Sequence, residues 1–438
     1  MIKSLKLLIK KITNNKIGKR IASGAFWSLT GSVFAKFLVL VSGIICAHIL
    51  SKEEYGQFGI VRSTINLFVT VGSAGMGVTA AKYISEFIAS DRKKIPSIFC
   101  LTNGFAFITG LIITLLILIF SFDIATYILK SPELAPSLRI GALLLFVTII
   151  NGAQNGTLAG LENFKAIAIN TLYGSIAESV FMLIGAYYWG VFGAVFGFGL
   201  GYIVILLANA VSIRKSFRSI NIIIEKFRIS REHISLLYKF SLPAALASCI
   251  TAPTFFIVRA MLTRFASFEE LAIYEVADQW RIIIMFIPAS ISQIVLPILS
   301  SISSSKNDTY WKVFKINILI NVAVAAIVTL FVSLFSEKIM SLYGENYTQN
   351  QSTLIILSLS TIFSAICNVV GAALQSKAKT WVGFSFNAVW AVLIISISYA
   401  CLIKGYGASS ISIAFFLSYI VLALGQILFL KYVLATKK

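Results

Sequence analysis

The sequence predicts an all-α protein that crosses a membrane about twelve times, in two pseudo-symmetric lobes of six helices. Of its 438 residues, 58% are apolar and only 12% are charged, and the mean hydropathy is +0.90. Soluble domains carry about a quarter charged residues. A folded soluble domain also needs at least about 50 residues, and no gap of that length separates the apolar runs. The composition therefore excludes a large soluble catalytic or nucleotide-binding domain.

Residues 1–24 form a basic amphipathic segment ahead of the first apolar run. Lysines and apolar residues follow one another there at helical spacing, which predicts a short helix on the cytoplasmic leaflet, attracted to the headgroups of anionic membrane lipids. The apolar run that follows is longer than the apolar core of a signal peptide. We therefore expect that run to be the first membrane span.

Windows of about 19 apolar residues divide the rest of the chain into spans. A basic cytoplasmic linker at 214–235 separates an N-lobe at 25–213 from a C-lobe at 236–438. Each lobe holds six predicted spans, with approximate bounds 25–49, 57–80, 97–120, 138–160, 169–188, 190–213, 236–262, 274–300, 316–337, 351–375, 380–402 and 406–430.

Lys and Arg residues concentrate in alternate loops, which predicts that both termini are cytoplasmic. The chain carries 37 Lys and Arg against 17 Asp and Glu. The loops expected to face outward hold few of these cations, namely Lys52, Lys130, Arg264, Lys338 and Lys404. Charge sorted in this way indicates orientation in a membrane, so we expect no nucleic-acid partner despite the formal net charge of +20.

The two lobes show a weak internal repeat. A shift of about 216 residues overlays SKEEYGQFGIVRS on SFEELAIYEVADQ, so that Glu53 and Glu54 match Glu269 and Glu270. Both copies begin on the same side of the membrane, which predicts a parallel repeat of the kind found in secondary transporters. The alternative is a coincidence between two apolar stretches.

Five basic residues remain within or at the outer ends of predicted spans: Lys36, Arg62, Arg139, Arg259 and Arg281. A charge near the bilayer centre costs about 2.5 to 3.5 kcal/mol, so it usually faces a protein interior or a water-filled cavity. All but Arg139, which we interpret as an anchor at a helix end, lie on spans that are equivalent in the two lobes. If the lobes face each other, these residues line one cationic cavity.

A cationic cavity complements an anionic headgroup, because Arg binds phosphate through two nitrogens and keeps its charge. Lys36 could instead extend its amine to the membrane surface or pair with a group inside the protein, and Arg281 could only neutralise Asp278. Two acidic residues, Glu178 and Asp278, are candidates for coupling transport to a proton or another cation. The alternative for both is a structural ion pair.

Nothing in the sequence indicates a cofactor or a metal site. The chain has two His and five Cys, without a CxxC pair. It also lacks the GxxxxGK[ST] motif that binds nucleotide phosphates. We therefore predict no catalytic residue, no metal and no ATP hydrolysis.

Several segments together resemble a known family. They are LSKEEYGQFG at 50–59, TAAKYISE at 79–86, KFSLPAALAS at 239–248 and IMSLYGENY at 339–347. In this order they resemble bacterial polysaccharide repeat-unit flippases, which transport O-antigen or capsule units and belong to the multidrug/oligosaccharidyl-lipid/polysaccharide (MOP) exporter superfamily. The resemblance implies a MATE-like fold with a central cavity between two six-helix lobes.

The resemblance also implies a function in the bacterial inner membrane. The substrate would be an oligosaccharide linked to undecaprenyl pyrophosphate, moved from the cytoplasmic to the periplasmic leaflet by alternating access. It implies that cavity cations at the positions of Arg62 and Arg259, with Lys36 and Arg281, engage the pyrophosphate. Transport would draw on the membrane potential, H+ or Na+, and the partners would be a polysaccharide polymerase and a chain-length regulator.

Two other functions fit parts of this pattern. A multidrug/cation antiporter shares the superfamily, but it typically carries embedded acidic residues where the first span here has Lys36. A polyprenyl-linked glycosyltransferase or polymerase would need a sizeable periplasmic loop for its catalytic groups, and the outer loops here are short.

Overall fold

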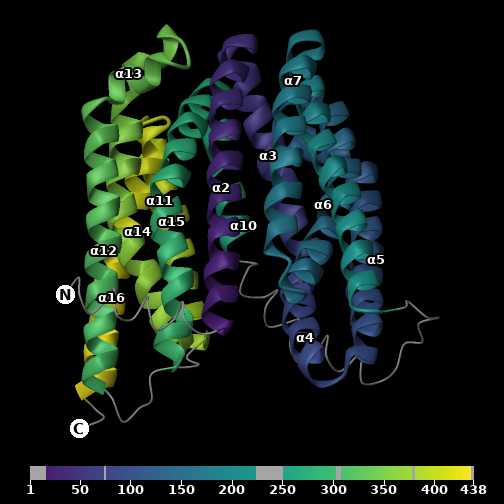
Figure 1. Cartoon of the computed structure of the whole chain (residues 1–438). Coiled ribbons are helices and arrows are strands. Elements are labelled where there is room, and N and C mark those ends of the chain that lie inside the picture. Colours follow the sequence, from purple (N-terminus) through teal and green to yellow (C-terminus); the bar gives the residue numbers. More distant parts are fainter. Residues whose placement is uncertain (1–15, 74, 223–249, 302–306, 377–379, 436–438) are drawn as a thin grey trace. The chain divides into compact units, whose positions relative to one another are not determined.

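The computed structural model describes residues 16–73, 75–222, 250–301, 307–376 and 380–435, and the regular elements within these ranges are all helical (Figure 1). The residues 1–15 of the predicted amphipathic segment, residues 223–235 of the predicted linker and the segment KFSLPAALAS lie outside the described residues. The helices are α2 (Lys16–Ile49), α3 (Lys52–Ser73), α4 (Met76–Ser90), η1 (Arg92–Lys94), α5 (Ile95–Asp123), η2 (Ile124–Ile128), η3 (Pro132–Leu134), α6 (Ala135–Gly160), α7 (Phe164–Ser219), α10 (Thr251–Phe265), α11 (Phe268–Ser301), α12 (Asn307–Leu334), α13 (Ser336–Ser341), η5 (Glu345–Asn350), α14 (Gln351–Ser376), α15 (Thr380–Ile403) and α16 (Ser409–Ala435).

Many of these helices are long and apolar enough to span a bilayer. Among the described residues eight helices meet that standard, or nine if α3 and α4 count as one bent span. Within α7, Trp189 and Gly190 leave the helical conformation, so its 56 residues form two helices that meet where the fifth and sixth spans were predicted to meet. The predicted all-α polytopic fold is confirmed.

The surface of these helices is suited to lipid. On α12, the side chains of Leu330, Phe331 and Leu334 are 61%, 56% and 72% exposed. Contiguous exposed apolar patches are uncommon on soluble monomers. Such helix faces therefore indicate contact with acyl chains, in agreement with the composition.

The helices group by contact into two units. Unit 1 contains the described residues of Met1–Ser42, Phe68–Ser121 and Pro136–Ser248, and unit 2 contains those of Gly43–Leu67, Phe122–Ala135 and Cys249–Lys438. Residues 43–67 and 122–135 thus belong with unit 2, although they precede the predicted linker in the sequence. The predicted lobe boundaries stay a prediction.

Unit 1 has an apolar core and a polar seam. Its core includes buried residues of α4, α5, α6 and α7: Ala80, Ile84, Ile95, Ile98, Leu158, Ile213 and Phe217. The seam joins α6 to both halves of α7, because buried Asn209 accepts a hydrogen bond from Asn170 (2.8 Å) and donates one to Asn155 (3.0 Å). Hydrogen bonds of this kind hold helices together where lipid offers no alternative partner.

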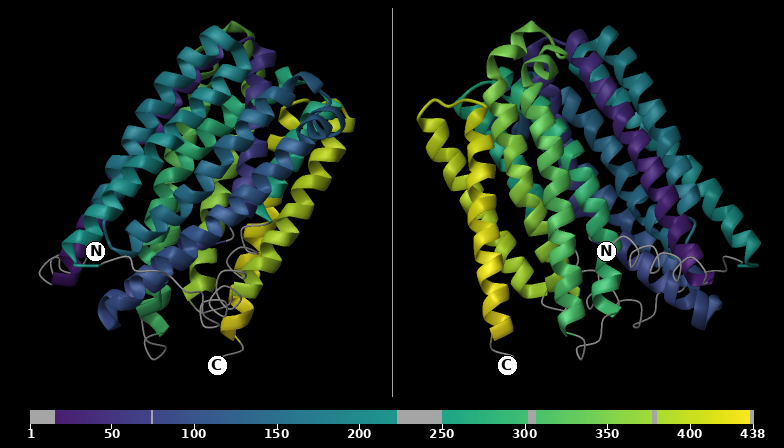
Figure 2. Two further views of the ribbon diagram at one scale, coloured as in Figure 1. Left: turned by 90° about the vertical axis from the view of Figure 1, so that its right-hand side faces the viewer. Right: turned by 60° about the vertical axis from the view of Figure 1, so that its left-hand side comes forward.

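Unit 2 is organised around α14, which packs against α11, α12 and α16. Helix α16 also lies along α15, as the yellow ribbon of Figure 2 shows. One buried cluster joins Tyr310 and Phe314 of α12 to Val370 and Leu374 of α14. This packing supports α11, the helix that carries most of the candidate site.

Helices α3 and α11 begin in the same way. Ser51 caps α3 by accepting a hydrogen bond from the Glu54 amide at 3.2 Å, and the Glu54 carboxylate accepts one from the Ser51 amide at 2.8 Å. Ser267 caps α11 by accepting one from the Glu270 amide at 3.2 Å. Such S-x-x-E sequences satisfy free amides at a helix start. The two caps occupy matching positions of the sequence repeat.

Candidate functional site: a buried arginine–carboxylate network

Glycines allow α3 to lie directly against α11. A Cβ atom on Gly56 would collide with the carbonyl oxygen of Phe268, and one on Gly59 would lie 2.6 Å from Cγ of Glu275. Any larger residue at either position would push the two helices apart. This close approach brings Arg62, one turn beyond Gly59, within reach of the Glu275 carboxylate.

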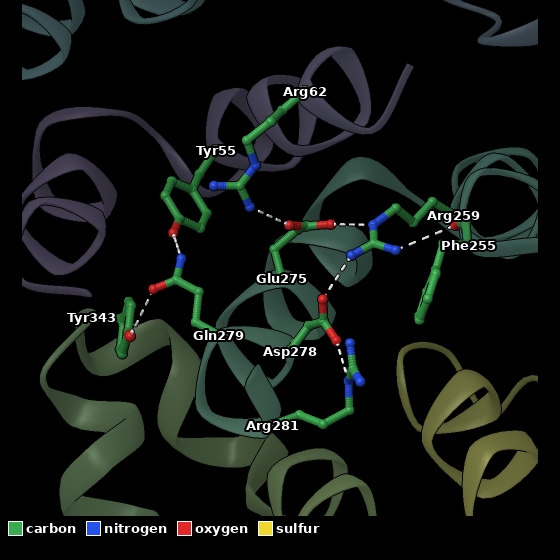
Figure 3. A network of polar contacts seen from close by, with 9 residues as sticks. All are labelled: Tyr55, Arg62, Phe255, Arg259, Glu275, Asp278, Gln279, Arg281 and Tyr343. Atoms are coloured by element: carbon green, nitrogen blue, oxygen red, sulfur yellow. Dashed lines mark hydrogen bonds and ion pairs between the residues drawn. The ribbon is translucent and has the colours of Figure 1, made fainter. Parts of the chain in front are cut away.

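Three arginines and two carboxylates alternate in one row (Figure 3). Arg62 Nη2 lies 2.7 Å from Glu275 Oε2, and Glu275 Oε1 lies 2.5 Å from Arg259 Nε. Arg259 Nη2 then lies 2.8 Å from Asp278 Oδ2, and Asp278 Oδ1 lies 2.5 Å from Arg281 Nε. Each carboxylate is shared by two guanidinium groups. The row begins and ends on a cation and carries one net positive charge.

The network is buried most deeply at its centre. The side chains of Glu275 and Asp278 are 2% and 5% exposed, that of Arg259 is 9% exposed, and those of Arg281 and Arg62 are 13% and 24% exposed. Removing a charge from water costs several kcal/mol, so these groups are stable only because they neutralise one another. Water and ligands reach the row most easily at Arg62.

Each nitrogen of the Arg259 guanidinium group donates a hydrogen bond within the protein. In addition to both carboxylates, its Nη1 donates to the Phe255 carbonyl oxygen at 3.2 Å, and the ring of Tyr274 lies 5.0 Å from its Cζ. Phe255 and the buried ring of Phe415 also lie 5.2 and 5.4 Å from Cζ of Arg281. Aromatic faces attract a cation at these distances.

The end arginines have unused donors. Within the described ranges, Nε and Nη1 of Arg62 and both terminal nitrogens of Arg281 make no hydrogen bond (Figure 3). A guanidinium group with two free N–H directions can hold a phosphate through two nitrogens. Arg62 and Arg281 are therefore the residues of this network that can contact an anion, whereas Arg259 positions the carboxylates.

Neutral hydrogen bonds continue the contact between α3 and α11. Gln279 donates to the Tyr55 hydroxyl at 2.5 Å and accepts from the Tyr343 hydroxyl at 3.2 Å. Burial raises the pKa of Tyr343 above its ordinary value, so its hydroxyl remains a neutral donor. Nearby, His48 contacts the Leu342 carbonyl oxygen at 2.9 Å.

The structure brings together four of the six residues singled out in the sequence. Arg62, Arg259, Arg281 and Asp278 form the network in unit 2. The other two lie in unit 1: Lys36 is half-buried on α2, and Glu178 is half-buried on α7, where it faces Gly201. The substrate-binding and coupling roles of all six stay predictions.

Sequence reasoning missed Glu275, the residue that joins Arg62 to Arg259. It lies next to the start of the predicted 274–300 span, where an acidic residue is unremarkable. A signal was nevertheless present, because Glu275, Asp278 and Arg281 recur every third residue and so share one face of α11. Among the described residues, no three His, Cys, Asp or Glu side chains gather as a metal site would require.

Solved structures with the same fold are membrane transporters. An inward-facing multidrug resistance MATE family transporter of the MOP superfamily matches 94% of this chain and 98% of its own, with a TM-score of 0.79 and 16% identity. A MOP superfamily transporter from Pyrococcus furiosus matches 96% of both chains, with a TM-score of 0.72 and 17% identity. These likenesses show the fold class, which is that of the two-lobed MOP structures.

Within this class, the chain belongs to the polysaccharide biosynthesis protein family, which matches residues 21–303, more than half of the chain. The MatE family matches residues 243–400. The EPS I polysaccharide export inner membrane protein EpsE of Ralstonia solanacearum is 25% identical over 425 residues and matches 93% of both chains. The succinoglycan biosynthesis transport protein ExoT of Rhizobium meliloti (strain 1021) is 24% identical over 263 residues, which are 60% of this chain and 50% of that protein. The family resemblance seen in the sequence is confirmed, and so is the prediction of a transporter rather than an enzyme.

Proposed function

We propose that the protein is a flippase of the bacterial inner membrane. Its substrate is an oligosaccharide repeat unit, of O-antigen or capsule, linked to undecaprenyl pyrophosphate. It moves this unit from the cytoplasmic to the periplasmic leaflet by alternating access, with both of its termini in the cytoplasm. Membership of the polysaccharide biosynthesis family and the names of EpsE and ExoT, which refer to polysaccharide export and succinoglycan transport, support this proposal.

The unused guanidinium edges of Arg62 and Arg281 are the observation that carries the proposal. They end a buried row with net positive charge, and a diphosphate offers several oxygens in the geometry that guanidinium groups bind best. Arg259 holds the two carboxylates in place between them. Lys36 of α2, a half-buried cation of unit 1, is a separate candidate for contact with the headgroup.

The membrane potential is the simplest energy source. Moving one elementary charge through 100 mV is worth about 2.3 kcal/mol, so a diphosphate with two charges gains roughly 4 to 5 kcal/mol when it leaves an inside-negative cell. Proton coupling through Asp278 would disrupt its ion pairs with Arg259 and Arg281. Coupling to H+ or Na+ at Glu178 is the remaining form of coupling in this proposal.

Complementation of a deletion strain tests the proposal. We expect Arg62→Ala and Arg281→Ala to reduce surface polysaccharide strongly at normal protein levels, because each removes an anion-binding edge. The matched control is Arg264→Ala, which removes an exposed arginine from the end of α10. Full restoration of polysaccharide by both network variants would refute the proposed site.

A second measurement separates the proposal from drug efflux and from polymerisation. Loss of the flippase should leave efflux of cationic dyes unchanged, whereas loss of a drug antiporter would abolish it. Loss of a polymerase would shorten surface chains instead of removing them. In the cell, the proposed partners that receive the exported units are a polymerase and a chain-length regulator.

A further inference from the structure

Glu275 occupies the position that a phosphate oxyanion would take between two arginines. Its two oxygens bind two different guanidinium groups, those of Arg62 and Arg259 (Figure 3). Gly59 leaves the space that this side chain occupies, because a Cβ atom there would lie 2.6 Å from Cγ of Glu275. A carboxylate placed in this way competes with any other anion for Arg62.

The two ends of this bridge differ in their accessibility and in their partners. Arg259 is 9% exposed and donates to three acceptors, whereas Arg62 is 24% exposed and donates only to Glu275 among the described residues. An incoming anion therefore meets Arg62 first. If Glu275 leaves Arg62, its carboxylate still has Arg259 as a partner, so the exchange strands no buried charge.

The bridge also joins two helices, because Arg62 belongs to α3 and Glu275 to α11. The neighbouring contacts between these helices are neutral, such as the hydrogen bond from Gln279 to Tyr55. Charged hydrogen bonds are roughly twice as strong as neutral ones. Losing the ion pair therefore removes the strongest polar contact between α3 and α11.

We propose that Glu275 is a displaceable substitute for the diphosphate of the substrate. The diphosphate replaces the Glu275 carboxylate on Arg62, and this exchange releases α3 from α11. Substrate binding and helix separation are thereby one event. This inference rests on the proposed function and adds to it the residue that couples binding to movement.

The test uses the full-length protein in lipid nanodiscs, free of its native cysteines. Spin labels are attached at Glu53→Cys on α3 and Ile287→Cys on α11, two exposed positions of unit 2. The distance between them is measured by pulsed EPR, with and without inorganic pyrophosphate. Pyrophosphate affinity is measured by calorimetry on the same proteins without labels.

Two variants should move the helices alike and affect binding in opposite ways. Glu275→Gln removes the competitor, so we expect a longer label distance without ligand and about tenfold tighter pyrophosphate binding. Arg62→Gln removes the shared partner, so we expect the same longer distance but at least about tenfold weaker binding. Because Glu275 keeps Arg259 in Arg62→Gln, that variant tests the movement even if Glu275→Gln fails to fold.

Two further variants show whether the effects come from loss of the Arg62–Glu275 pair or from loss of any negative charge. Asp278→Asn removes a carboxylate of the same network but leaves the pair between Arg62 and Glu275 intact, so the label distance should not change. Glu269→Gln removes an exposed negative charge from the first turn of α11 and should change neither measurement.

The outcomes distinguish this inference from the proposed function. Pyrophosphate that binds the wild-type protein without lengthening the label distance refutes the exchange and leaves the function in place. Glu275→Gln that binds no tighter than wild type also refutes it. If pyrophosphate binds neither the wild-type protein nor Glu275→Gln, both the proposed binding of an anionic headgroup and the exchange are refuted.

Discussion

Single residues in the network have different roles although they share one chemistry. Arg62 and Arg259 both bind Glu275, but among the described residues only one nitrogen of Arg62 donates a hydrogen bond, whereas all three nitrogens of Arg259 do. The sequence could identify both as charges in a span. Their different roles follow from the number of acceptors around each, which only the folded chain reveals. Glu275 escaped notice for the same reason, because its burial depends on Gly59 of another helix.

Replacing Arg259 should destabilise the protein more than replacing Arg62. Arg259→Gln removes two ion pairs and the hydrogen bond to the Phe255 carbonyl oxygen, and we expect a loss of about 3 kcal/mol in the free energy of unfolding. Arg62→Gln removes one partly exposed pair, with an expected loss of about 1 kcal/mol. Chemical unfolding of the purified proteins in detergent measures both. Equal losses would contradict the structural role assigned to Arg259.

At the scale of the helices, apolar runs predicted most elements. Glycines mark the break between α3 and α4 and the close contact between α3 and α11. The predicted 351–375 and 380–402 spans agree with α14 and α15. The predicted 57–80 span instead ends early, because α3 stops at Ser73 and α4 starts at Met76, after Gly75 with a left-handed φ of 71°. Helix α11 starts at Phe268, ahead of the predicted 274, because its first turn is polar and capped by Ser267. Hydropathy alone detects neither feature.

The close approach of α3 and α11 should depend on Gly56. Gly56→Ala places a methyl group against the Phe268 carbonyl oxygen, so we expect the helices to separate and the free energy of unfolding to fall by about 1 to 3 kcal/mol. The matched control is Gly371→Ala on α14, where a Cβ atom would meet nothing within 4 Å. Unfolding of both variants checks this expectation, and a Gly56→Ala protein as stable as Gly371→Ala would contradict it.

At the scale of the whole molecule, the sequence predicted the all-helical polytopic fold, which is confirmed, whereas its lobe boundaries stay a prediction. Charge placement separates two sets of six spans at the 214–235 linker. Contacts place residues 43–67 and 122–135 in unit 2. Helices α2 and α3 each contribute residues to both units, and a linear sequence offers no signal for such a division, because the deciding contacts join residues some two hundred positions apart.

The predicted orientation has a direct test. Lys93 and Lys404 are exposed residues in loops predicted to lie on opposite sides of the membrane. In intact cells, a membrane-impermeant maleimide should label Lys404→Cys but not Lys93→Cys, and permeabilised cells should show labelling of both. The opposite pattern would reverse the direction of transport that we propose.

The row of ions alternates three arginines with two carboxylates, and its net charge is positive because it has an arginine at each end. Losing either terminal arginine would make the row neutral, while the four remaining groups could stay paired in place. A single substitution can therefore weaken the attraction for an anionic cargo without changing how the helices pack. Evolution would have a simple route by which a common scaffold acquires cargoes of different valence.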